Sequence, residues 1–148
     1  MRQRVLPYRP TAVALGVLAL LNVAWLRHYA ISTAIAIVLY LLVFLLAFFG
    51  GRRARLLKRA PGWYGASIGV LFGVVAGLGS FLIRDSLRDI DVPAHTAVRL
   101  KLLAWANSPD GHLAALATAM IAFGIITLIA GLVGGISVKD PNDSSDTA

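Results

Sequence analysis

Four glycines stand at regular four-residue spacing in one strongly apolar segment of the chain. They are Gly65, Gly69, Gly73 and Gly77, called the glycine strip below. Residues four apart share one face of an α-helix, so the glycines lay a flat line of backbone along that face. In water each glycine costs a helix about 1 kcal/mol relative to alanine, whereas membrane helices use such positions for close packing. The spacing therefore predicts a membrane helix with a second helix pressed against the strip.

The composition also favours a protein that lies in a membrane. Of 148 residues, 58% are hydrophobic and only 14% are charged, whereas about 25% are charged in an average soluble domain. The absence of cysteine excludes disulfides, thiolate metal sites and a cysteine nucleophile. The net charge of +7 comes from bases beside apolar segments. We therefore attribute it to membrane orientation and expect no nucleic-acid partner.

Four segments are apolar over about the 20 residues that a membrane-spanning helix requires. None of them contains Asp, Glu, Lys or Arg. We predict an all-α integral membrane protein with a single four-helix transmembrane domain over residues 1–148. Gly50 and Gly51 are interpreted as the end of the second helix, since glycine commonly ends helices. The four predicted helices cover residues 10–26, 30–49, 64–83 and 112–136.

Basic residues predict which way the four helices point, because cytoplasmic loops are enriched in Lys and Arg. Both the N-terminal stretch and the loop after the second helix are basic, while the intervening turn has only Arg27 as a Lys or Arg residue. We therefore expect both termini to be cytoplasmic, in a bacterial-type inner (plasma) membrane, with a longer outer loop over residues 84–111. The bases that decide this are Arg2, Arg4, Arg9, Arg52, Arg53, Arg55, Lys58 and Arg59.

The first apolar segment also has the basic start of a secretory signal peptide. It is long, and it ends without a small-x-small cleavage site. We expect a retained membrane anchor, with cleavage as the alternative. At the other end of the chain, residues 137–148 are polar and are expected to form a disordered tail.

Two different helices could pack against the glycine strip, one from the same chain and one from another chain. The fourth helix is rich in small residues, among them Gly124 and Gly131, and could pack on the strip within one chain. The strip could instead face a second copy or a different membrane protein. The sequence leaves both arrangements open. Tyr40 and Thr127 are expected at a similar depth, where a hydroxyl pair would join two helices.

The outer loop contains a segment with two possible structures. Residues 96–102 alternate apolar and basic residues, which is a strand pattern, yet the same stretch also fits a short helix lying on the membrane. We prefer the helix, because a lone strand has no partner for its backbone. Ser108, Pro109 and Asp110 are expected to cap and begin the fourth helix.

Residues that carry out chemistry are scarce in the predicted spans. No ionisable side chain lies inside the four segments, where proton pumps and ion-coupled transporters place one. Histidines and aspartates on the outer side could hold a divalent metal, but their spacing is not that of a known motif. We therefore expect no catalytic residue, metal or cofactor. The outer residues considered are His28, His95, His112, Asp85, Asp89, Asp91 and Asp110.

These observations define three hypotheses for function. The leading one is a non-enzymatic accessory or assembly subunit that packs through the glycine-rich third helix. The alternative is a small oligomeric channel or transporter for an ion or uncharged solute. A third is an enzyme for a lipid-linked substrate that would use His95, His112 or the loop aspartates. In each case Arg52, Arg53, Arg55, Lys58 and Arg59 are expected to bind anionic membrane lipid or an acidic partner.

Overall fold

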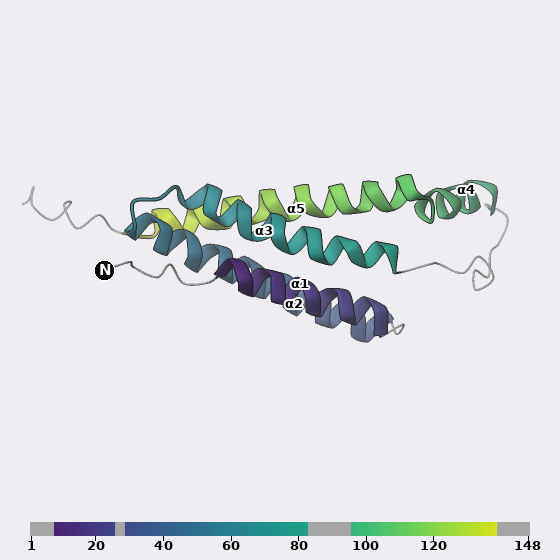
Figure 1. The fold of residues 1–148 in the computed structure, drawn as a ribbon, viewed down its shortest axis with the longest axis horizontal. Coiled ribbons are helices and arrows are strands. Elements are labelled where there is room, and N and C mark those ends of the chain that lie inside the picture. The colour runs from purple at the N-terminus through teal and green to yellow at the C-terminus, as the bar shows by residue number, and fades with distance from the viewer. Residues whose placement is uncertain (1–7, 26–28, 83–95, 139–148) are drawn as a thin grey trace, which may run out of the picture.

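The computed structural model describes residues 8–25, 29–82 and 96–138, and every regular element in these ranges is a helix (Figure 1). The predicted all-α class is confirmed for this part of the chain. The predicted disordered tail beyond residue 138 and the loop aspartates up to Asp91 lie outside the described residues. The helices are α1 (Tyr8–Trp25), α2 (Tyr29–Leu56), α3 (Pro61–Gly77), the 3₁₀-helix η1 (Leu78–Phe81), α4 (Thr96–Ala106) and α5 (Pro109–Ile136).

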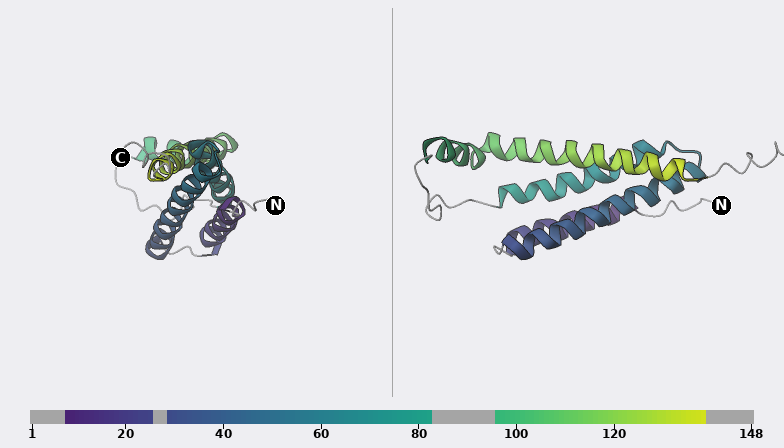
Figure 2. Two further views of the ribbon diagram at one scale, coloured as in Figure 1. Left: turned by 90° about the vertical axis from the view of Figure 1, so that its left-hand side faces the viewer. Right: turned by 180° about the vertical axis from the view of Figure 1, so that it is seen from behind.

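Helix α3 lies at the centre of an elongated bundle and contacts α1, α2 and α5 (Figures 1 and 2). Its interior side chains form the described core with α1 and α2. Ile68 and Phe72 are fully buried, and Val43 of α2 is 1% exposed. Helix α4 lies beyond the first turn of α5, at the opposite end of the bundle from the α2–α3 connection. The glycine-bearing helix α3 is therefore the element on which α1, α2 and α5 pack.

Two helices in the described residues are long and apolar enough to cross a membrane. They are the Thr33–Leu56 part of α2 and the whole of α5. Only 28% and 22% of the residues in their most apolar stretches are buried, so most of this apolar surface faces outward. Helix α3 is apolar but has 17 residues. The predicted four-span topology is thus supported for two helices, and the other two spans stay a prediction.

The end of α2 differs from the prediction. Gly50 and Gly51 lie inside the helix, which continues to Leu56. The helix ends with Lys58 in the left-handed region at φ 54°. There the Lys58 and Arg59 amides donate to the carbonyls of Arg55 and Ala54, 2.9 and 2.8 Å away, which is the hydrogen-bond pattern of a Schellman C-terminus. The glycines do not end the helix, because both are used for packing against α3 and α5.

The segment before α5 forms a helix, so the strand alternative for residues 96–102 is wrong. Helix α4 leads into a tight turn whose cap matches the sequence signal. The Ser108 hydroxyl accepts a hydrogen bond from the Gly111 amide at 3.2 Å, Pro109 occupies the first turn, and Asp110 follows it. This confirms the predicted start of the last long helix.

Candidate functional site: the α3–α5 interface and the basic end

The glycine strip lies against α5 of the same chain. An added Cβ atom at Gly65 would overlap the Thr127 carbonyl oxygen and would lie 3.0 Å from the Gly131 Cα atom. At Gly69 it would overlap both the Phe123 carbonyl oxygen and the Thr127 hydroxyl. These neighbours are mostly backbone atoms, which cannot rotate away as the end of a side chain can. The two helices therefore touch backbone to backbone at these positions.

The close approach continues toward the α4 end of the bundle. At Gly73, an added Cβ atom would lie 2.8 Å from the Ala119 carbonyl oxygen and 2.9 Å from the Met120 Cα atom. At Gly77 it would lie 2.8 Å from a methyl carbon of Leu116. All four strip positions thus face α5, and a partner protein can reach the strip only if α5 first moves away.

Gly131 is the point where three helices meet. Its backbone lies against Gly51 of α2 and Gly65 of α3, and an added Cβ atom on it would lie 2.6 Å from the Pro61 carbonyl oxygen. Gly134, one turn further along α5, is similarly close to the Phe48 carbonyl of α2. Gly124 is different, because a Cβ atom added there would meet only a methyl group of Val70, at 3.2 Å. Of these three α5 glycines, Gly131 and Gly134 are therefore the ones packed against the backbone of other helices.

Gly51 and Gly16 are packing positions that the sequence interpretation missed, whereas Gly134 belongs to the small residues that made the fourth helix a candidate partner for the strip. Gly51 stands directly before an arginine run, where a glycine resembles a helix terminator. A usable signal was present in the spacing of Gly131 and Gly134, which are three apart and so share one face of α5. At Gly16 of α1, an added Cβ atom would lie 2.7 Å from the Cβ atom of Val75.

Aromatic rings fill the centre of the bundle beside the strip. The Phe72 and Phe123 rings meet edge to face with centroids 4.9 Å apart, and the Tyr40 ring lies 5.0 Å from Phe123. The predicted hydroxyl pair between Tyr40 and Thr127 is wrong. The Thr127 hydroxyl donates instead to the Phe123 carbonyl of its own helix at 2.6 Å. A threonine in an apolar helix has this carbonyl within reach, so its hydroxyl needs no second helix.

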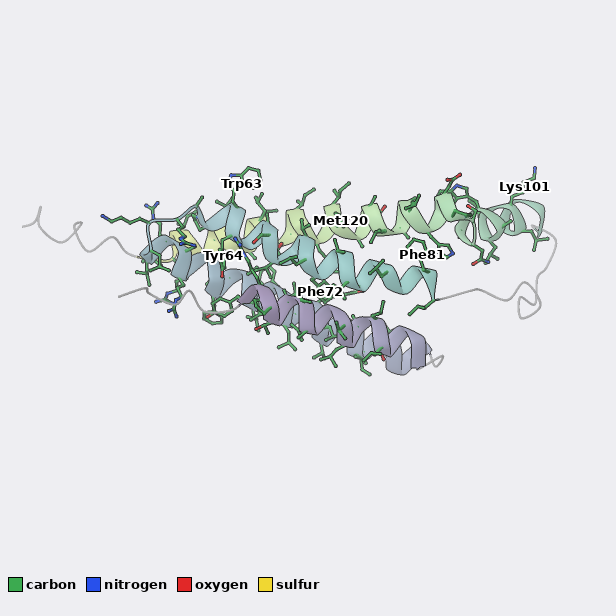
Figure 3. All side chains as sticks on the ribbon, viewed as in Figure 1. Trp63, Tyr64, Phe72, Phe81, Lys101 and Met120 are labelled. Carbon is green, nitrogen blue, oxygen red and sulfur yellow. The ribbon has the colours of Figure 1, made fainter. Side chains whose placement is uncertain are left out.

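The second feature of interest is the end of the bundle where α2 ends and α3 begins. Six basic residues lie there. We call it the basic end; nitrogen-bearing side chains gather there in Figure 3. Asp110 is the only acidic residue in the described ranges, and it lies in the first turn of α5. Because 28 residues of helix are about 40 Å long, that carboxylate is far from the basic end. The six bases are Arg9, Arg52, Arg53, Arg55, Lys58 and Arg59.

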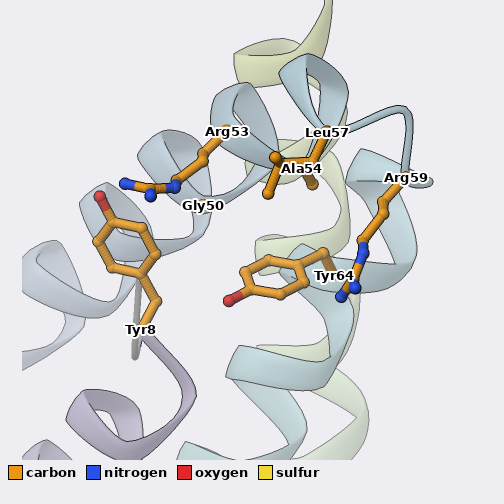
Figure 4. Close-up of a pocket in the computed structure, with 7 residues that line it drawn as sticks. All are labelled: Tyr8, Gly50, Arg53, Ala54, Leu57, Arg59 and Tyr64. Atoms are coloured by element: carbon orange, nitrogen blue, oxygen red, sulfur yellow. The ribbon is translucent and has the colours of Figure 1, made fainter. Parts of the chain in front are cut away.

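Tyr64 is the centre around which part of this end is arranged. It follows Trp63 in the chain, a pair typical of an aromatic belt at the membrane interface. Only Trp63 is exposed, at 76%, while Tyr64 is 7% exposed. Its ring fits because Gly50 of α2 has no side chain there. The Arg9 guanidinium lies over the ring, 4.9 Å from its centroid. Arg53, Arg59 and Tyr8 line the hollow beside it; the Arg53 guanidinium lies next to Tyr8, and Arg59 lies on the other side of Tyr64 (Figure 4).

Side chains suited to catalysis or metal binding do not converge in the part of the chain that the structure describes. No three His, Cys, Asp or Glu residues come together there as a metal site would require. His112 stacks on Phe81 with ring centroids 4.9 Å apart, and so joins the end of η1 to the start of α5. His28, His95 and the loop aspartates up to Asp91 lie outside the described residues.

The chain was compared with known proteins in three ways. It matches no family model, no curated protein and no solved structure.

Proposed function

We propose that the protein is an integral membrane protein that crosses a bacterial-type inner membrane four times, with both termini in the cytoplasm. The exposed apolar surface of the long helices supports this. Ile121 and Ile129 of α5 are 62% and 53% exposed, and Leu41 of α2 is 58% exposed. A soluble protein would leave this surface in water, whereas lipid covers it without penalty.

The lengths of the two remaining helices support their crossing as well. The 17 residues of α3 and the four of η1 together extend about 33 Å at the rises of α- and 3₁₀-helices. The hydrocarbon core of a bilayer is about 30 Å thick. Helix α1 has 18 residues and extends about 27 Å, which is sufficient with interfacial residues at each end.

Labelling of introduced cysteines tests this topology, because the native chain has no cysteine to interfere. Leu56→Cys lies at the end of α2, and Lys101→Cys lies in α4; both positions are exposed. We expect a membrane-impermeant maleimide to label Lys101→Cys in intact cells and to label Leu56→Cys only after permeabilisation. Labelling of both variants in intact cells would place the two positions on one side and contradict the crossing by α3.

Within the membrane, we propose a non-enzymatic role as an accessory or assembly subunit. One observation carries this proposal: the described interior is devoted to helix packing. Apart from Tyr64 with its phenol, Thr127 has the only polar side chain among the buried residues whose exposure the structure describes, and its hydroxyl is used within α5. The glycine strip packs α3 tightly against α5 and is covered by it. A partner protein would therefore contact the outer faces of the helices. On α5, Ala115, Thr118 and Ala122 are exposed and share one face, which suits close approach of another helix.

The same small-residue face favours a second candidate, in which copies of this chain associate into a channel or transporter. Mass measurement separates the two. After extraction in native lipid discs, we expect a fixed stoichiometric complex with another membrane protein. A discrete homo-oligomer would contradict the accessory role and justify solute-flux assays in vesicles. A bare single chain under conditions that preserve other membrane complexes would contradict both.

A further inference from the structure

We propose that the outer side of the bundle between α2 and α5 binds a membrane-spanning helix of another protein, and that this helix supplies a hydrogen-bond acceptor to the Tyr40 hydroxyl in the middle of the membrane. The inference rests on the proposed membrane insertion and accessory role. It goes beyond them because it names the surface, the residue that recognises the partner and the chemical group that the partner presents.

The Tyr40 hydroxyl is the first argument. The Tyr40 ring packs against Phe72 and Phe123, with centroids 6.1 and 5.0 Å away, but its hydroxyl makes no hydrogen bond with any residue that the structure describes. By contrast, the Ser67 and Thr127 hydroxyls donate to carbonyls of their own helices at 2.7 and 2.6 Å. A tyrosine hydroxyl stands at the end of a rigid ring and cannot reach back in this way. Because Tyr40 is 47% exposed, its partner can come from outside the chain.

The depth of Tyr40 in the membrane is the second argument. Its ring is level with Phe123, which lies about 15 Å from Leu113 and about 20 Å from Ile136 along α5. The hydrocarbon core of a bilayer is about 30 Å thick, so water and headgroups stay far from this level. Acyl chains contain no acceptor there, and a polar group without a partner in hydrocarbon is strongly disfavoured. The acceptor for Tyr40 therefore belongs to another molecule inside the membrane.

The arrangement of α2 leaves room for that molecule beside Tyr40. Helix α2 meets α5 near the basic end, where Gly51 packs on Gly131, and it diverges from α5 toward the α4 end (Figures 1 and 2). Tyr40 lies about three turns before Gly51, on the same side of α2. Ile37 and Phe44 share a face with Tyr40, and they are 53% and 41% exposed. The side of α2 that α5 covers near the basic end is therefore open around Tyr40.

The adjoining side of α5 identifies the occupant as a helix. Ile126 lies one turn after Phe123 and is 49% exposed, while Ala122 and Ala115 beside it are exposed small residues. Small side chains let a second helix approach closely, and polar groups of membrane helices form hydrogen bonds across such contacts. We call this surface the α2–α5 face; it consists of Ile37, Tyr40, Phe44, Ala115, Ala122 and Ile126.

Ile37 and Val38 provide a matched pair for crosslinking. They are neighbours on α2 and are 53% and 55% exposed, but only Ile37 lies one turn from Tyr40 on the same face. The photoreactive amino acid p-benzoylphenylalanine is introduced in place of either residue and activated in native membranes. Mass spectrometry then identifies the adducts. We expect one discrete adduct with a different membrane protein from position 37, and adducts with lipid alone from position 38.

Tyr40→Phe tests the hydrogen bond, because it removes the hydroxyl and keeps the ring. Tyr8→Phe is the control, since Tyr8 begins α1 at the membrane surface, where water replaces a lost partner. We expect Tyr40→Phe to lower the yield of the position-37 adduct about threefold, the effect of one hydrogen bond between membrane helices. Tyr8→Phe should leave the yield unchanged. In the purified chain alone, Tyr40→Phe should unfold at the same midpoint as the native chain.

Each opposite result would overturn the proposal. A lower unfolding midpoint for purified Tyr40→Phe would show that the hydroxyl has a partner within the chain. Equal adducts from both positions, or a yield that Tyr40→Phe leaves unchanged, would mean that Tyr40 does not recognise the partner. An adduct between two copies of this chain would assign the face to self-association, and lipid adducts alone would assign it to the bilayer. If a stoichiometric complex in native lipid discs persists despite such a result, the accessory role stands without this face, so the two failures are distinguishable.

Discussion

Gly69→Ala is expected to destabilise the protein more than any other single methyl group added to the glycine strip. The new Cβ atom would overlap the Phe123 carbonyl oxygen and the Thr127 hydroxyl, and it would lie 2.7 Å from the Phe123 carbonyl carbon. Backbone cannot rotate away, so α3 and α5 must separate and lose dispersion contacts along their length. We expect a loss of about 3 kcal/mol in the free energy of unfolding, the upper end for overpacking. Gly69→Leu should have a larger effect.

Reversible unfolding in mixed detergent micelles measures this change, with Gly124→Ala as the control on the same interface. At Gly124 the new methyl group meets only the end of Val70, at 3.2 Å, which a small rotation relieves. The helix also gains about 0.5–1 kcal/mol when alanine replaces glycine, so this variant should be as stable as the native chain or slightly more stable. Equal unfolding midpoints for the two variants would show that α5 does not cover the strip as described.

The all-helical fold class and the glycine-lined packing face of α3 could be predicted from the sequence, because both depend on local sequence pattern. Long apolar segments and a four-residue glycine period are visible in one dimension. The element that covers the strip could not be assigned in this way. Small residues in α5 and a second copy of the chain satisfy the same pattern, and only the three-dimensional arrangement distinguishes them, because a Cβ atom added at Gly65 would lie 3.0 Å from the Gly131 Cα atom.

The errors at the basic end have one physical origin. A glycine before a basic run predicts a helix end, and a tyrosine beside a tryptophan predicts an interfacial belt. Each rule treats a residue by itself, whereas Gly50 and Tyr64 are determined together: the missing side chain of one makes room for the ring of the other. Helix α2 actually ends at Leu56, and the chain turns at Lys58, a residue that adopts a positive φ only at an energetic cost and so gives no local signal.

The adjacent glycines of α2 should respond very differently to the same substitution. Gly51→Ala would place its Cβ atom onto the Gly131 carbonyl oxygen and within 2.6 Å of the Gly131 Cα atom, at the point where α2, α3 and α5 meet. Gly50→Ala would meet only the Tyr64 ring edge at 3.0 Å and the end of Ile68 at 3.1 Å. Both substitutions replace glycine by alanine inside the same helix, so helix propensity changes the free energy of unfolding equally in the two variants. The difference between the variants therefore isolates the contact with α5.

We expect Gly51→Ala to lose about 2–3 kcal/mol in the free energy of unfolding and Gly50→Ala to lose less than about 1 kcal/mol. The same micelle unfolding assay gives both values. If Gly51 instead ended a helix and faced solvent, alanine there would cost little, and the two variants would unfold alike. A large loss confined to Gly51→Ala requires that α2 continues past this residue and crosses α5 there. That crossing joins the end of α2 directly to the α3–α5 pair, at the point where Gly131 brings the three helices together.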